Sequence, residues 1–187
     1  MKYDEKIEKQ IDNKDKVDWF YISEFQQLSE SFIEKYKDKV YYWFCISKYQ
    51  KLSKAFMKDH NIEKPIDSWL YITTKEKLAY IKANTSYEII DDKYIIAYKS
   101  TRADGYSCYN FQYLYEVDGI YESHCDCNIK YENSFGLSAW TKEKALEYHS
   151  NGKLFKVKIA IEDIGAIVHN NNKIRCRKLE ILEEIEK

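Results

Sequence analysis

A short segment of the chain holds His124, Cys125 and Cys127, residue types that bind zinc. An imidazole and two thiolates at a turn after a strand can form a tetrahedral site, with Cys108 or Cys176 as the fourth ligand. Structural zinc sites usually present two well-separated ligand pairs, whereas this segment supplies a single Cys-x-Cys. We therefore expect free thiols and no metal. If a metal does bind, the expected ligands are Cys108, His124, Cys125 and Cys127.

Basic residues offer a second kind of site. Arg102 follows a predicted strand, where its planar guanidinium could bind an anion or a nucleotide. Positive charge also concentrates near the last predicted strands and could meet an acidic protein surface or RNA. The candidate binding residues are Arg102, Lys156, Lys158, Lys173, Arg175 and Arg177. Alternating lysines on the outer face of a strand are also ordinary protection of a sheet edge, which is the alternative interpretation.

Other catalytic motifs do not occur in the sequence. It has no phosphate-binding loop, nucleophile elbow or His-Glu-x-x-His, and His60, His149 and His169 stand apart from one another. The formal net charge of −1 excludes a strongly basic nucleic-acid footprint. No apolar run is long enough to span a bilayer, and the charged start lacks the apolar core of a secretory signal. We expect a cytoplasmic protein that has no cofactor and makes no contact with a membrane.

The elements that must position these residues fall into two parts. Aromatic residues make up 16% of the 187 residues, which is too much buriable ring surface for a disordered chain. Residues 17–33 line up with residues 43–57 at an offset of 24, and a degenerate third copy begins at Trp69. In each copy a Ser or Thr after Ile (Ser23, Ser47, Thr73) is predicted to cap one amphipathic helix. Neighbouring copies are expected to stack, because such short units cannot bury their apolar stripes alone.

Alternating apolar residues replace this periodicity in the second part. Strands are predicted at 94–99, 111–117, 154–161, 166–169 and 174–182, with a helix from Thr141. The fold class is therefore α+β, with an N-terminal helical repeat region packed on a small, mostly antiparallel sheet domain. The expected divisions are a helical extension at 1–16, the repeats at 17–83 and the α+β domain at 93–187.

The repeats, which read Trp-x-x-Ile-Ser-x-(Tyr/Phe)-Gln-x-Leu-Ser, resemble tandem units of phage, prophage and large-DNA-virus accessory proteins. Segments 97–107, 110–113, 133–141 and 173–177 look like the small C-terminal domain that follows such repeats. The resemblance covers roughly residues 17–187. It implies a viral origin, and no catalytic residue is carried over because the family has no assigned activity.

A more distant likeness to ADP-ribosyltransferases has Arg102, Ser138 and Glu180 in about the right order. In that fold an early Arg holds the dinucleotide, a Ser positions it and a strand Glu stabilises the ribosyl centre. The likeness implies an enzyme that uses NAD.

The hypothesis we favour is a non-enzymatic accessory protein of a phage or prophage in the bacterial cytoplasm. It would bind a host protein or ribonucleoprotein complex, for example as an anti-CRISPR-like inhibitor of bacterial defence, because Tyr and Trp suit interfaces. Direct binding of nucleic acid is not favoured. The NAD-dependent enzyme is the first alternative, and a structural or virion-associated interaction module is the second.

Overall fold

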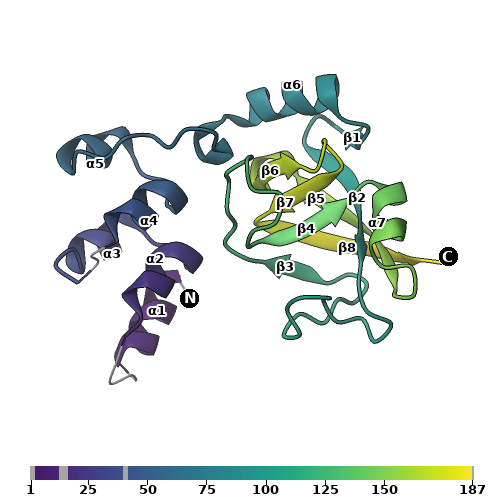
Figure 1. Ribbon diagram of the computed structural model, residues 1–187, viewed down its shortest axis with the longest axis horizontal. Coiled ribbons are helices and arrows are strands. Elements are labelled where there is room, and N and C mark those ends of the chain that lie inside the picture. The colour runs from purple at the N-terminus through teal and green to yellow at the C-terminus, as the bar shows by residue number, and fades with distance from the viewer. Residues whose placement is uncertain (1–2, 13–16, 40–41, 187) are drawn as a thin grey trace. The chain divides into compact units, whose positions relative to one another are not determined.

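The computed structural model describes residues 3–12, 17–39 and 42–186 (Figure 1). The chain divides into two compact units, Met1–Leu70 and Tyr71–Lys187. Helices form most of the first unit and strands most of the second, so the predicted α+β class is confirmed. Residues 1–2 and 13–16 of the predicted N-terminal extension lie outside the described residues. In the described part of the chain, no helix combines the length and apolar character needed to cross a membrane.

The repeats of the first unit are pairs of helices. The unit contains α1 (Tyr3–Asp12), α2 (Trp19–Phe25), α3 (Glu30–Lys35), α4 (Trp43–Tyr49) and α5 (Lys54–Asp59). The predicted single helix per copy is therefore wrong. Ser23 is not a cap: it lies buried inside α2, and its Oγ donates to the Trp19 carbonyl at 2.7 Å. The caps of the second helices are Ser29 and Ser53, whose hydroxyls accept from backbone N–H groups three residues on.

Equivalent contacts join successive copies. Ser29 donates through its N–H and hydroxyl to Asp4 on α1, and Ser53 donates in the same way to Glu30 on α3. Helix α1 thus supplies a carboxylate acceptor to the first copy, as α3 does to the second. Gln50 adds a further link, because its buried amide bonds the backbone between α2 and α3. Stacking of the two clear copies therefore rests on polar contacts as well as on apolar ones.

Rings of equivalent position fill the space between the paired helices. In the first copy, Tyr36 packs against Trp19 and Phe32 at centroid distances of 5.3 and 4.7 Å. In the second copy, His60 packs in the same way against Trp43 and Phe56, at 4.9 and 4.3 Å. The apolar core beneath them includes Ile22, Leu28, Phe32, Ile33, Ile46 and Leu52.

The predicted third copy does not fold as a third pair of helices in the first unit. A short 3-10 helix, η1 (Trp69–Tyr71), is followed by α6 (Thr74–Asn84), which belongs to the second unit. Thr73 caps α6 as predicted, in a capping box with Glu76. The buried Lys77 then bonds the carbonyls of Glu162 and Ile164 at the start of a strand. These contacts place the division at residue 70, whereas the sequence pattern suggested residues 84–92.

The second unit is built on an antiparallel sheet. Its strands are β1 (Glu88–Ile90), β2 (Tyr94–Ser100), β3 (Ile120–Glu122), β4 (Leu137–Trp140), β5 (Leu154–Ala160), β6 (Ile164–Val168), β7 (Lys173–Cys176) and β8 (Lys178–Ile185). Their order is β3-β8-β5-β2-β4-β7-β6, and β1 pairs with β2. Helix α7 (Lys142–Tyr148) lies beside β2 and β4 (Figure 1).

Two predicted strands differ from the structure. The predicted strand 174–182 is two strands, β7 and β8, joined through Arg177 alone and separated by three others in the sheet order. In a flat sheet four steps of about 4.8 Å would part them by roughly 19 Å, more than one linking residue spans, so the sheet must curl. The predicted strand 111–117 is part of a loop, residues 101–119, in which Tyr106 and Leu114 form an isolated bridge.

Candidate functional site

The loop 101–119 exposes large aromatic side chains. The Tyr109 and Phe111 residues are 84% and 61% exposed, unusually high values for rings of this size. The Arg102 guanidinium lies 5.0 Å from the centre of the Phe111 ring, and it also pairs with Asp104 at 2.8 Å. On α7, Tyr148 lies beside Tyr109, with ring centroids 6.3 Å apart. We call Arg102, Tyr109, Phe111 and Tyr148 the aromatic surface.

Internal hydrogen bonds give this loop a defined shape. Gly105 has φ +85°, a conformation that favours glycine, and its carbonyl accepts from the Tyr115 N–H at 3.0 Å. The Ser107 hydroxyl accepts from the N–H groups of Tyr109 and Asn110. Tyr115 is buried and anchors the loop. The exposed rings are thus held on an ordered backbone, which lowers the entropy lost when a partner binds.

Ring contacts continue from the aromatic surface to the turn between β6 and β7. Trp140, at the end of β4, stacks on Tyr148 at 5.1 Å and contacts His169 at the same distance. The Lys173 ammonium lies 5.0 Å from the Trp140 ring centre. The surface therefore borders a cluster of polar side chains.

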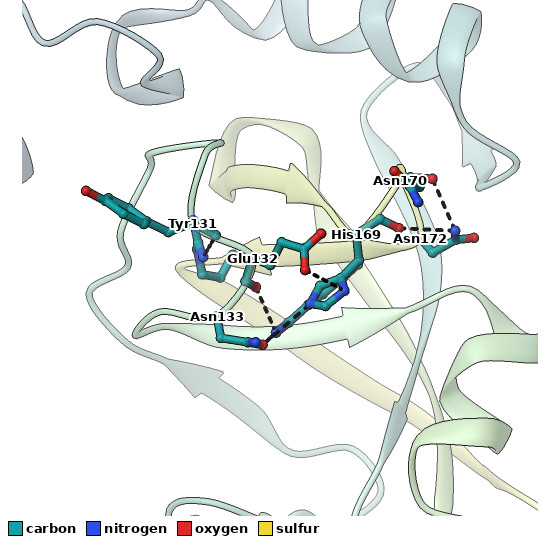
Figure 2. A network of polar contacts seen from close by, with 8 residues as sticks. Tyr131, Glu132, Asn133, His169, Asn170 and Asn172 are labelled. Atoms are coloured by element: carbon teal, nitrogen blue, oxygen red, sulfur yellow. Dashed lines mark hydrogen bonds and ion pairs between the residues drawn. The ribbon is translucent and has the colours of Figure 1, made fainter.

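Figure 2 shows this polar network. The Lys173 ammonium donates to the Glu132 carbonyl at 3.1 Å and to Asn133 Oδ1 at 3.0 Å. His169 points at the same two residues, with Nδ1 3.5 Å from the Glu132 carboxylate and Nε2 3.5 Å from Asn133 Oδ1. Burial is the main cause that lowers the pKa of Lys173 to about 8, and Arg175 adds to it.

The network fastens a strained turn to the neighbouring loop. His169, Asn170 and Asn171 all have positive φ, near +52°, +52° and +67°, which side-chain-bearing residues adopt rarely. The Asn172 amide bonds the carbonyls of His169 and Asn170 and so holds the turn closed. Contacts within the protein account for the Lys173 and His169 geometry, and this network carries no catalytic assignment.

The predicted basic residues do not form one exposed surface. Lys156 and Lys158 pair across the sheet with Glu183 and Glu180, at 3.3 and 2.6 Å. Arg102 lies apart from them on the loop 101–119, where it pairs with Asp104. The remaining three lie wholly or partly inside the second unit: Lys173 in the polar network, Arg175 fully buried and Arg177 half-buried against Cys127.

The hydrogen-bond partners of the Arg175 side chain are backbone carbonyls of the protein itself. Its guanidinium donates to the backbone carbonyls of Asp126, Asn128 and Tyr131, at 2.8, 2.6 and 2.7 Å. One buried side chain therefore holds the loop between β3 and β4, and it is unavailable to an external ligand.

The register separates the residues proposed for NAD chemistry. Glu180 pairs with Lys158, which lies opposite Ile96, and Arg102 follows six residues further along the chain from Ile96. Strand β2 ends at Ser100, four residues beyond Ile96, so at about 3.3 Å per residue the strand alone covers roughly 13 Å, and Arg102 lies in the loop beyond it. Ser138 lies on β4 opposite Arg175, where its carbonyl accepts from the buried Lys99 ammonium at 2.9 Å. The three residues are thus not brought to one place.

The residues predicted to bind zinc, if a metal binds at all, do not form a metal site either. Among residues 3–12, 17–39 and 42–186, no group of three or more His, Cys, Asp or Glu side chains is placed to hold a metal ion. Cys125 and Cys127 are neighbours. Cys108 lies in the loop 101–119, close enough for the charges of Lys99 and Arg102 to act on it.

The sequence did not predict that Tyr109, Phe111 and Tyr148 would be exposed. One available signal was the stretch from Gly105 to Tyr115, which is rich in Tyr and has no charged residue. Its alternation favoured a strand, and only the structure shows its rings in solvent. Comparison with protein-family models, with curated proteins and with solved structures found no match for this chain.

Proposed function

We propose that the chain is an accessory protein of a phage or prophage that binds a host protein through the aromatic surface. The observation that carries the binding role is the pair of ordered, exposed rings, Tyr109 and Phe111, with Arg102 over one of them. Tyr and Arg dominate the residues that contribute most binding energy at protein interfaces. The viral origin comes from the family resemblance, and the place in the host cytoplasm and the anti-CRISPR-like role are hypotheses that follow from that origin.

The charge of the loop favours a protein partner over RNA. Within residues 101–119 the charged side chains are Arg102, Asp104, Glu116 and Asp118, so three carboxylates stand against one guanidinium. A phosphate backbone would be repelled by this excess. A protein surface with an apolar pocket and basic residues around it would complement the loop.

Binding is tested with a double variant, Tyr109→Ser with Phe111→Ser. The tagged protein is recovered from a phage-infected host, the complex is identified by native mass spectrometry and its affinity is measured with the purified partner. Each such residue contributes about 2 kcal/mol, or about 30-fold in affinity, so the loss of both rings should weaken binding by roughly 900-fold.

Phe44→Ser is the matched control, because Phe44 is 74% exposed but lies on α4 in the first unit. Its complex should keep the affinity of the unchanged protein. Equal affinities for all three proteins would contradict the proposal. Recovery of the protein with phage particles alone would instead favour a virion-associated module.

A further inference from the structure

The unassigned feature with the most developed chemistry is a pair of thiols, Cys125 and Cys127. Residues two apart in an extended chain project to the same side. Both sulfurs accordingly lie against Gly165 of β6, where an added Cβ would overlap the sulfur of Cys125 and lie 3.3 Å from that of Cys127. When protonated, the Cys127 thiol donates to the Cys125 carbonyl at 3.7 Å, which adds a second link between the two residues. Because both sulfurs lie within 3.3 Å of the same point beside Gly165, the two thiols are close neighbours on one side of the chain.

One of the two thiols has a cationic partner. The Arg177 guanidinium, in the single-residue link between β7 and β8, donates to the sulfur of Cys127 at 3.2 Å. The hydrogen bond from Cys125 and the charge of Arg177 lower the pKa of Cys127 to about 7, against the effect of burial. The pKa of Cys125 is raised, chiefly by the same hydrogen bond and by burial. The pair is therefore asymmetric, because the Arg177 guanidinium stabilises negative charge on the sulfur of Cys127.

We propose that Cys125 and Cys127 form a peroxide-sensitive modification site. The Cys127 thiolate attacks one oxygen of a hydroperoxide; the O–O bond breaks, hydroxide leaves, and a sulfenic acid forms on Cys127. The Cys125 sulfur then attacks the Cys127 sulfur as its proton passes to the departing oxygen, so that a disulfide forms and water leaves. Overall, two thiols and one hydrogen peroxide give one disulfide and two waters.

Two observations favour this chemistry over metal binding. A guanidinium 3.2 Å from the sulfur repels a metal cation but stabilises a thiolate. Cys125 and Cys127 are also only 1% and 2% exposed, which favours a small oxidant such as hydrogen peroxide over a bulky disulfide. This site is independent of the aromatic surface and of the proposed function.

The test is titration of the native protein with hydrogen peroxide, followed by unfolding, alkylation and mass spectrometry of intact chain and fragments. The expected result is a loss of 2 Da with a bond between residues 125 and 127. It should occur at lower peroxide than oxidation of Cys108, which is more exposed but has a raised pKa. A 125–127 pair that stays reduced while Cys108 reacts would overturn the proposal.

Single substitutions test the asymmetry. In Cys125→Ser, dimedone should trap a sulfenic acid on Cys127; in Cys127→Ser, Cys125 should trap none. Arg177→Gln should slow oxidation by about five-fold at pH 7, because a pKa about one unit higher lowers the thiolate fraction that much. Trapping on Cys125 rather than Cys127 would overturn the assignment even if Arg177→Gln failed to fold.

Discussion

Replacement of Gln50 by Leu should destabilise the first unit selectively. The Gln50 amide accepts from the Leu28 N–H at 3.0 Å and donates to the carbonyls of Ser23 and Gln26, at 3.0 and 2.8 Å. Gln50 is 1% exposed, so water cannot replace the amide at these groups without a rearrangement. Leu keeps most of the volume and removes all three hydrogen bonds.

The size of the effect follows from these three bonds. At about 1 to 1.5 kcal/mol for each lost hydrogen bond, the free energy of unfolding should fall by about 3 to 4.5 kcal/mol. A unit of this length has a total stability of only about 4 to 10 kcal/mol. The loss should therefore lower its melting temperature by about 12 °C or more.

Hydrogen exchange followed by mass spectrometry resolves the two units separately. Amides between α2 and α3, including that of Leu28, should exchange about 100-fold faster in Gln50→Leu, while those of β2 and β5 stay unchanged. The control is Gln26→Leu, since Gln26 occupies the equivalent position 24 residues earlier and is half-buried. A destabilisation below about 1 kcal/mol, or an equal effect of both substitutions, would refute the role given to Gln50.

Three further predictions concern the second unit. Arg175→Met should cost about 3 kcal/mol and free the 126–131 loop, seen as new proteolytic cleavage there, because three carbonyls lose their partner; an uncut loop would contradict this. Burial lowers the pKa of Lys99 to about 8, so the unfolded chain binds more protons above that value, and unfolding free energy should rise from about pH 8 to pH 10. Lys99→Met should flatten that rise in denaturant titrations, and an unchanged slope would exclude Lys99 as its source. Gly152→Ala should cost roughly 3 kcal/mol or more in thermal unfolding, because an added Cβ would overlap the Thr101 carbonyl; a near-neutral result would show that the backbone yields there.

Local patterns predicted the elements that depend on nearby residues. The 24-residue offset predicted two equivalent copies, although each copy folds as two helices and not as the predicted one. Thr73 formed the predicted cap because capping joins residues three apart. The strands β2, β5 and β6 followed from runs of Ile, Val and Leu. The same patterns misplaced Ser23, because a Ser inside a helix can bond the preceding turn as readily as a Ser at its start.

The sequence by itself thus determined the α+β class, the duplication and most of the strands, since these depend on periodicity and on neighbours along the chain. Only the tertiary structure decided which charged and aromatic side chains face solvent. Arg175 and Arg177 are two residues apart, yet one is buried on three carbonyls and the other meets a thiol, because the sheet curls at the link between β7 and β8. Strand register and sheet curvature are non-local properties, so the exposed rings of the aromatic surface and the paired thiols become visible only when distant segments are brought together.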